Sequence, residues 1–196
     1  MIGTTLSYLR QRVDQSITSS TNKKTTLKNQ QRVFLIGGEQ AEPITFPQDA
    51  VSMLLLNLEE DREQRSLDAY RQTQPTKGHD QSIKKPPDIR LILHILFVAK
   101  FTDCALGWNV LSDVIGCFQA NPALSSTNDP LFPAPLGMLT AEMISPSYSD
   151  INKIWSALRV SQRPAVLYRF KIITLKAKEE QPVQTVKTVK IEYQNH

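Results

Sequence analysis

The segment from Asp88 to Lys100 is hydrophobic on both of the faces that a β-strand presents. Alternate residues of a strand point to opposite sides, and both sets are apolar here: Ile89, Leu91, Leu93, Ile95 and Phe97 form one, and Ile92, Leu96 and Val98 the other. Such a strand is stable only where both faces of its sheet are covered. The segment therefore predicts a central strand. Pro86-Pro87, directly before it, disfavour a helix and favour an extended backbone at its start.

Weaker patterns predict the elements around this strand. Hydrophobic residues spaced three and four apart predict helices over residues 1–17, 103–120 and 151–158. Alternating or β-branched runs predict strands over residues 32–36, 50–58, 138–144 and 165–175, and a last one near the C-terminus. Helices between strands on one mixed sheet indicate an α/β (α+β) fold, with a mixed β-sheet flanked by about three helices.

The sequence also predicts how the helices begin and which faces they bury. Thr102 is the expected N-cap of the second helix and Ser149 that of the third. In the second helix one stripe of residues is expected to be buried: Cys104, Trp108, Leu111, Ile115 and Phe118. Residues 121–137 contain four prolines and predict an irregular loop.

Length and composition limit the class of protein. The chain has 196 residues, of which 40% are hydrophobic and 21% charged, as in an ordinary globular protein with one core. We expect one domain over residues 1–178 and a tail over 179–196. Two cysteines exclude a disulfide scaffold. The longest apolar run, Leu91–Ala99, is too short to cross a bilayer as a helix, so we expect no transmembrane segment.

Charge is distributed unevenly along the chain. Residues 1–30 carry five bases and one acid, and residues 151–196 carry nine bases and three acids. Residues 88–150 instead carry two bases and six acids. This asymmetry suits nucleic acid, an anionic surface, head-to-tail contacts between identical subunits, or an ordinary solvated surface.

The residues that could support catalysis or bind a metal are scattered. His79, His94 and His196 lie far apart in sequence and no C-x-x-C occurs, so we expect no metal site. Cys104 lies near a helix N-terminus, which favours a thiolate. Cys117, next to Phe118, has no acid or base nearby in the sequence that could activate its thiol. A cysteine hydrolase acting through Cys104 is one hypothesis. The simpler expectation is no catalytic residue, no cofactor and no small-molecule substrate.

Two polar segments are candidate interaction surfaces. Residues 62–87 form a long basic connection, of a length that is usually functional or mobile; its cations are Arg62, Arg65, Arg71, Lys77, Lys84 and Lys85. The C-terminal segment carries spaced hydrophobic residues: Val183, Val186, Val189, Ile191 and Tyr193. A strand formed there would either protect its own sheet edge or add to the sheet of another subunit. Both alternatives remain open at this stage.

Several segments in fixed order resemble one family. They are the opening helix (1–17), MLLLNLEED (53–61), PPDIRLILHILFVA (86–99), DCALGWNVLSDVIGCFQANP (103–122), LTAEM (139–143) and INKIWSALRVSQRPAVLYRFKIITL (151–175). Together they resemble the N-terminal domain of tail-terminator or cap proteins of extracellular contractile injection systems. The family tends to have glycine after the leucine of its W-x-x-L element, where this chain has Arg159. That difference concerns the geometry at the helix end.

The resemblance implies a structural role. It implies a fold similar to that of phage tail terminators, and a homohexameric ring on the inner tube protein and the sheath protein that ends polymerisation and fixes length. It also implies assembly in the cytoplasm and then a place in a phage-tail-like particle. Under this reading residues 62–87 face the tube and the C-terminal segment pairs with the sheath, while Trp155, Leu158, Pro164 and Tyr168 hold a helix to the sheet. The alternative is a nucleic-acid-binding adaptor that uses the basic ends.

Overall fold

The computed structural model describes residues 2–21, 32–37, 44–61, 82–84, 89–133, 136–175 and 181–183. Within these ranges the chain forms three helices: α1 (Ile2–Thr21), α2 (Cys104–Ala120) and α3 (Tyr148–Leu158). The strands are β1 (Val33–Ile36), β2 (Ala50–Glu60), β3 (Ser82–Lys84), β4 (Ile89–Lys100), β5 (Ala123–Ser125), β6 (Met138–Ile144), β7 (Ala165–Leu175) and β8 (Gln181–Val183).

The main sheet has six strands in the order β1-β2-β4-β7-β6-β5. The strand predicted to be central, β4, pairs in antiparallel fashion with β2 on one side and β7 on the other. The first two strands are parallel and the remaining pairs are antiparallel. The predicted mixed sheet is therefore confirmed, and β4 lies in its interior because both faces of its sequence are apolar.

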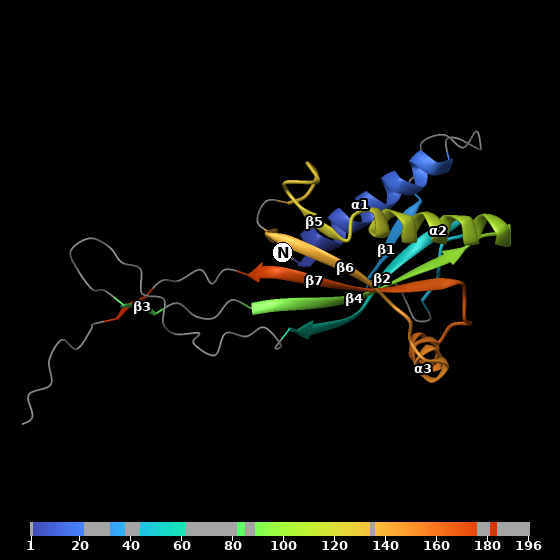
Figure 1. The fold of residues 1–196 in the computed structure, drawn as a ribbon. Helices are drawn as coiled ribbons and strands as arrows, with labels where there is room; N and C mark the ends of the chain where they lie inside the picture. Colours follow the sequence, from blue (N-terminus) through green and yellow to red (C-terminus); the bar gives the residue numbers. More distant parts are fainter. Residues whose placement is uncertain are drawn as a thin grey trace, which may run out of the picture.

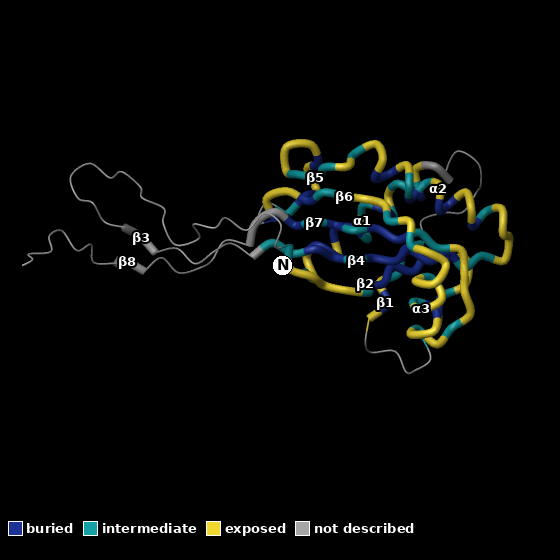
Figure 2. The backbone as a smooth tube through the Cα atoms, turned by 60° about the horizontal axis from the view of Figure 1, so that its bottom comes forward, coloured by how far each residue is buried: buried dark blue, intermediate teal, exposed yellow. Residues whose placement is uncertain are grey.

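Helices cover both faces of this sheet. In Figure 1, α1 and α2 lie on one face and α3 lies on the other. Phe97 of β4 belongs to the core beneath α1 and α2, whereas the adjacent Val98 belongs to the core beneath α3. The buried trace runs through the middle strands, with exposed segments around it (Figure 2). The alternation in β4 thus divides the interior into two hydrophobic layers.

The first helix packs as its sequence predicts. Its spaced hydrophobic residues Leu6, Leu9, Val13 and Ile17 are buried in the core on that face. At its C-terminal half, Asp14 Oδ1 accepts hydrogen bonds from the backbone N–H groups of residues 32 and 33, at 2.7 and 3.0 Å. One carboxylate therefore fixes where β1 begins relative to α1.

The second helix differs from its prediction in two ways. Its N-cap is Asp103, whose side chain accepts a hydrogen bond from the backbone N–H of Ala105. Thr102 instead donates its backbone N–H to Asp49, at 2.8 Å. Asp49, in the turn before β2, thus accepts a hydrogen bond from the residue that was expected to cap α2. This hydrogen bond holds the pKa of the Asp49 carboxyl below the usual range.

The buried face of α2 is also not the predicted stripe, because Cys104 and Trp108 are exposed and Ile115 is only partly buried. The buried residues are Gly107, Val110, Leu111, Val114, Cys117 and Phe118. A Cβ at Gly107 would lie 3.4 Å from Phe101, so the glycine fits closely against that ring. Two hydrophobic stripes share Leu111 and Phe118, and packing against Phe101 and the sheet selects the second.

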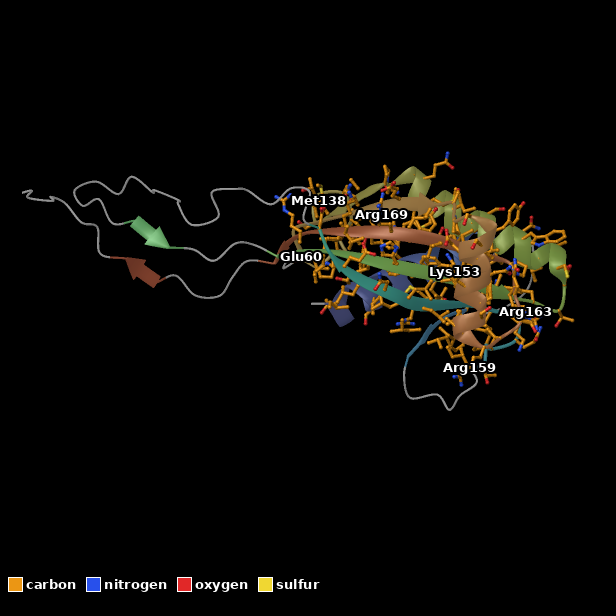
Figure 3. The ribbon with its side chains drawn as sticks, turned by 90° about the horizontal axis from the view of Figure 1, so that it is seen from below. Glu60, Met138, Lys153, Arg159, Arg163 and Arg169 are labelled. Atoms are coloured by element: carbon orange, nitrogen blue, oxygen red, sulfur yellow. The ribbon has the colours of Figure 1, made fainter. Side chains whose placement is uncertain are left out.

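The N-cap of the third helix lies two residues earlier than predicted. Its N-cap is Ser147, whose hydroxyl oxygen accepts the Asp150 N–H at 3.2 Å, while Ser149 lies in the first turn. At the other end Arg159 is the C-cap in the left-handed region, with φ 54° and ψ 34°. Figure 3 shows Arg159 and Arg163 at this end of the molecule, and Glu60 and Met138 at the opposite end.

Three short strands differ from the prediction: β5 and β3 lie in segments that were expected to contain no strand, and β8 lies at the start of the predicted C-terminal strand. Within the predicted loop 121–137, β5 pairs with β6 through Leu124 and Leu139. A separate two-stranded sheet joins β3 and β8, with Lys84 opposite Gln181 and Ser82 opposite Val183. The strand expected around Val189–Tyr193 lies outside the described residues.

Candidate functional site

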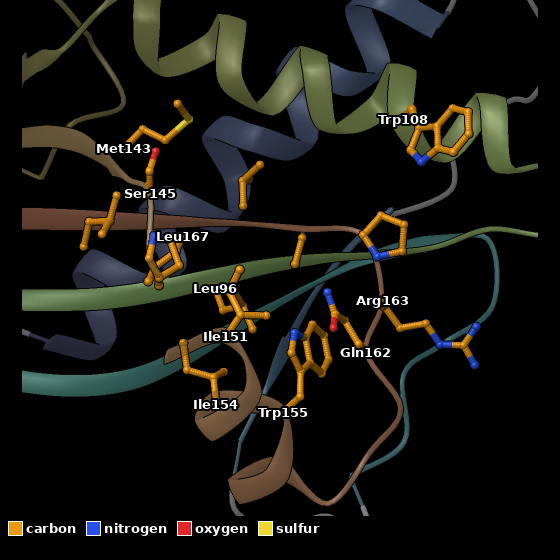
Figure 4. Close-up of a pocket in the computed structure, with 15 residues that line it drawn as sticks. Leu96, Trp108, Met143, Ser145, Ile151, Ile154, Trp155, Gln162, Arg163 and Leu167 are labelled. Carbon is orange, nitrogen blue, oxygen red and sulfur yellow. The ribbon is translucent and has the colours of Figure 1, made fainter. Parts of the chain in front are cut away.

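A groove of about 730 Å³ opens at one end of the main sheet, between the start of α2 and α3 (Figure 4). Its walls come from α2 and from the consecutive elements β6, α3 and β7. Trp108 of α2 lies on one side, Ile151 and Trp155 of α3 lie on the other, and Met143 of β6 and Leu167 of β7 lie between them. Most of these lining residues are apolar.

Large apolar side chains in this groove are exposed to solvent. Trp108 is 60% exposed and Met143 is 50% exposed. Beside the groove, at the first position of α3, Tyr148 is 90% exposed. Single exposed hydrophobic residues are ordinary, whereas several that share one hollow mark a binding surface. The groove is therefore the strongest candidate for an interaction site among the described residues.

The floor of the groove is packed into the core beneath α3. Trp155 is only 7% exposed and packs edge to face against Phe46, with ring centroids 6.4 Å apart. Leu158 packs partly buried against the same core layer. Pro164 is exposed and lines the groove just before β7. Tyr168 lies on the opposite face of the sheet, in the core with Phe118, so it does not contact α3.

Charged residues of the strands and helix that border the groove form ion pairs with one another. Arg169 donates to both carboxylate oxygens of Glu142, at 2.8 Å from Nη2. On α3, Lys153 Nζ lies 3.0 Å from Asp150. The Ser147 hydrogen bond, and then Lys153, hold the pKa of Asp150 below its usual range. Arg163 also lines the groove and has no ion pair among the described residues, so the rim carries a positive charge.

Beside the groove, the hydrogen-bonded ladders of β6 with β7 and of β5 with β6 come to an end. The last residue pair between β6 and β7 is Ile144 with Leu167. Continuing this register would place Pro146 opposite Ala165, but β6 has ended and proline has no N–H to donate. On the other side of β6, β5 extends only as far as Thr140. The groove thus lies where two neighbouring strands lose their partners.

The predicted tube-facing cations are mostly not described by the structure. Lys84 lies in β3, whereas Arg62, Arg65, Arg71, Lys77 and Lys85 lie outside the described residues. Of the predicted sheath-pairing residues, Val183 lies in β8, and Val186, Val189, Ile191 and Tyr193 lie outside. The pairing of β3 with β8 brings together the two segments that we assigned to different partners.

The possible catalytic residues are not brought together by any interaction within the described ranges. Cys104 is exposed on the first turn of α2, not buried as expected, and Cys117 is buried. Burial raises the pKa of the Cys117 thiol, with Arg12 and Ser16 opposing the shift. His94 Nε2 lies 3.4 Å from Glu59 on the sheet. These positions do not form a nucleophile and base pair.

Two further observations limit the chemistry of the described part of the chain. It gathers no group of three or more metal-ligating side chains. It also contains no helix with the length and apolar character that a membrane span requires.

Two cations of the basic ends form ion pairs within the chain. Arg12 lies 3.3 Å from Asp129, which is itself buried, and Arg169 pairs with Glu142 across two strands. A phosphate-binding surface needs cations that are available to the solvent. The nucleic-acid alternative therefore gains no support from these two residues.

Sequence reasoning missed the groove. It predicted that Trp108 would be buried, and it gave Met143 no role. One signal in the sequence could have revealed it. The stripe of α2 that contains Val110, Val114 and Cys117 also has helical spacing, and burying that stripe leaves Trp108 exposed to solvent.

Comparison with known proteins agrees with this architecture. The family described as the Pvc16 N-terminal domain matches residues 5–188. The sheath/tube terminator of the extracellular contractile injection system PVC, in its extended state, has a similar structure, with a TM-score of 0.53 and 16% identity. The match covers 93% of this chain and 63% of that one.

A second similar structure is the tube-terminating cap of the anti-feeding prophage, with a TM-score of 0.49 and 16% identity, over 74% of this chain and 49% of that one. This chain therefore spans about half to two thirds of the length of these two proteins. No curated protein matches its sequence.

Proposed function

Because this chain belongs to the Pvc16 N-terminal domain family, we propose that it acts as a sheath/tube terminator, or as the main domain of one, in a contractile injection particle. The observation that carries the proposal is the family match over residues 5–188, which includes all six strands of the main sheet. The likeness in fold to the PVC terminator, over 93% of the chain, supports it.

The terminator role places physical demands on the protein. It must bind the last ring of a growing tube or sheath, and it must not offer an equivalent surface to the next subunit. A closed ring of identical copies meets this demand, because each copy uses two complementary patches and none remains open at closure. Charges of the acidic middle (88–150) and of the basic ends, apart from those paired within the chain such as Arg12 with Asp129 and Arg169 with Glu142, are the proposed source of these complementary patches. We therefore propose a homohexameric ring on the inner tube and the sheath.

The groove beside α3 and the paired segments β3 and β8 are the proposed contact regions. We propose that the basic segment 62–87 faces the tube and that the C-terminal segment contacts the sheath. Since β3 and β8 pair with one another, the two contacts are expected to depend on each other. Deleting residues 182–196 should weaken sheath attachment, and full co-purification of the truncated chain with sheath would contradict this assignment.

The proposed role requires no catalytic residue and no cofactor. The protein would assemble in the cytoplasm and then remain in the finished particle.

The test is the length of particles made by cells that lack this chain, measured by electron microscopy. Loss of a terminator predicts overlong and heterogeneous tubes and sheaths, and normal length returns when the chain is supplied. Particles of normal, uniform length in its absence would overturn the proposal.

A further inference from the structure

The strand β2 has an unpaired edge at its C-terminal end. Its neighbour β1 ends at Ile36, opposite Leu54, whereas β2 continues to Glu60. The next described residue after Gly37 is Ile44, which packs in the core beneath α3 and not along β2. On this side of β2, the described part of the chain therefore provides no strand beyond Leu54.

The backbone of Leu58 faces this open edge. The N–H of Asp61 donates to the carbonyl of Arg90 at 2.9 Å, so it points toward β4. Backbone groups of adjacent residues in a strand point to opposite sides, so those of Glu59 also point toward β4 and those of Leu58 point outward. Within the described ranges, no backbone hydrogen bond outside the strand ladders involves Leu58. Leu58 thus offers one donor and one acceptor to an added strand.

The two faces of this edge differ in chemistry. Leu58 lies opposite Leu93, on the face of α1 and α2, and its side chain is 44% exposed. Glu59 lies opposite Ile92, on the other face of the sheet, where its exposed carboxylate is 3.4 Å from Nε2 of His94. A strand added here would meet an apolar side chain on one face and a carboxylate on the other.

The same edge of a second copy does not suit this site. Two equivalent edges would meet across a two-fold axis, and β2 ends in three consecutive acids, Glu59, Glu60 and Asp61. Such a contact would bring two acidic strand ends close together, and like charges across neighbouring strands are destabilising. The edge therefore suits a strand that carries a positive charge.

The C-terminal segment, which lies outside the described residues, has the matching sequence. In an extended chain its alternate apolar residues share one face: Val189, Ile191 and Tyr193. Lys190 then lies on the other face. An antiparallel strand with Ile191 opposite Leu58 places its apolar face on the exposed leucine. The same register places Lys190 opposite Glu59, where the ammonium group pairs with the carboxylate.

The direction of the chain favours a second copy as the source of this segment. β7 and β2 run the same way, because both are antiparallel to β4. The segment follows β8, which pairs with β3, and Figure 1 shows β3 apart from the main sheet, beyond the start of β4. Within one copy, residues 184–187 would have to reverse the chain and also reach back to β2. A neighbouring copy can approach β2 without that reversal.

We propose that copies of this chain exchange C-terminal segments, so that residues 188–193 of one copy pair with the Leu58 edge of the next. The proposal rests on the proposed terminator function, in which identical copies close into a ring. The contact is heterologous, because the donated segment and the accepting edge are different surfaces, and a closed ring leaves no accepting edge open. The outer edge of the added strand remains available for the sheath contact.

Amide hydrogen exchange at Leu58 tests the main-chain pairing. In the full-length chain, both at rising concentration and on particles, exchange at Leu58 should slow at least about tenfold, while exposed backbone around Leu131 does not change. A chain that ends at Val183 should lose this protection. Protection that persists in the truncated chain would overturn the proposal, as would an unprotected Leu58 in full-length chains on particles. Neither result changes particle length, which tests the terminator function separately.

Charge exchange tests the side-chain pairing. Glu59→Lys should weaken the association of copies about threefold to tenfold, measured by sedimentation and by retention on particles, and adding Lys190→Glu should restore it. The matched control adds Lys187→Glu instead, which gives the same net charge on the other face of the extended segment and should not restore association. Restoration by both additions, or by neither, would overturn the proposal.

A disulfide tests which copy supplies the segment. Leu58→Cys and Ile191→Cys are placed on separate chains, both with Cys104→Ser to remove the exposed native thiol. On oxidation the mixture should form a disulfide between chains, and Leu131→Cys in place of Leu58→Cys, at another exposed leucine, should not. A chain that carries both substitutions and closes the disulfide within itself would overturn the exchange.

Discussion

The hydroxyl of Tyr8 donates a 2.6 Å hydrogen bond to Oδ2 of Asp129, a residue 121 positions away in the sequence. The bond is buried, and Arg12 lies 3.3 Å from the same carboxylate oxygen. The Tyr8 ring also packs edge to face on Phe132, with centroids 5.2 Å apart. This cluster ties α1 to the segment between β5 and β6, on the face opposite the groove's α3 wall.

Removing the Tyr8 hydroxyl should therefore destabilise the fold. In Tyr8→Phe the buried Asp129 loses a donor, which costs about 1–3 kcal/mol of the free energy of unfolding. Urea denaturation measures this loss. Tyr148→Phe, at a fully solvated tyrosine, is the control and should leave the free energy unchanged. Equal stability of Tyr8→Phe and wild type would contradict the role of this bond.

The same tyrosine should make stability depend on alkaline pH. Burial, and then the hydrogen bond to Asp129, raise the pKa of Tyr8 above its ordinary value. Because the folded state favours the neutral phenol, its contribution is fully present below about pH 10 and is lost as pH rises further. The free energy of unfolding should therefore fall as pH rises above about 10, and less steeply in Tyr8→Phe.

Burial also raises the pKa of Tyr168, so part of this alkaline slope should remain in Tyr8→Phe and decrease in the double variant with Tyr168→Phe. Identical slopes in all three proteins would exclude both tyrosines as its source.

The end of α3 contains a residue that is not suited to its conformation. Arg159 has a positive φ of 54°, which glycine adopts without the steric cost that a Cβ causes. Arg159→Gly should be more stable than Arg159→Ala by about 1 kcal/mol. Comparing these two variants cancels the loss of the arginine side chain. Chemical denaturation measures the difference, and an alanine variant as stable as the glycine variant would contradict the strain.

The two tryptophans of the chain form a matched pair. Trp155 is 7% exposed and Trp108 is 60% exposed. Trp155→Ala should lower the free energy of unfolding by about 3–5 kcal/mol, because it leaves a cavity beneath α3. Trp108→Ala should change it by less than about 0.5 kcal/mol. Equal losses in the two variants, measured by thermal or urea unfolding, would show that the groove wall has been placed incorrectly.

The two cysteines should differ in reactivity. Cys104 is exposed, whereas Cys117 is buried and its thiol has a raised pKa. A thiol reagent should modify one cysteine in the native protein and the second only after denaturation. The Cys104→Ser variant should then show no reactive thiol in the native state. Rapid native modification of that variant would mean that the Cys117 side chain of α2 is not buried.

The sequence predicted the parts of the fold that depend on local alternation. In β4 both faces are apolar, and only the centre of a covered sheet suits such a strand. The family resemblance, based on segments such as 151–175, is confirmed by the family match. The resemblance singled out Arg159 as a departure from the family pattern at the helix end, and the structure has a positive φ of 54° at this residue.

The sequence could not predict the features that depend on tertiary packing. Both hydrophobic stripes of α2 have helical spacing, and the tertiary packing that buries one of them cannot be read from the sequence of the helix. The groove lies where β6 has ended at Ile144, opposite Leu167, while β7 extends two residues further, to its first residue Ala165. This offset depends on how the two strands pair, and the sequence of either strand alone does not reveal it. The pairing of β3 with β8 likewise joins two segments that lie far apart in the chain.

The central claim is that this chain closes the end of a particle, and its location on the particle tests this most directly. Cryo-electron microscopy of particles that carry the chain should resolve one ring of copies at a single end, with the six-stranded sheet fitted into its density. Copies distributed along the tube or sheath, or a capped end whose density does not contain this fold, would contradict the account.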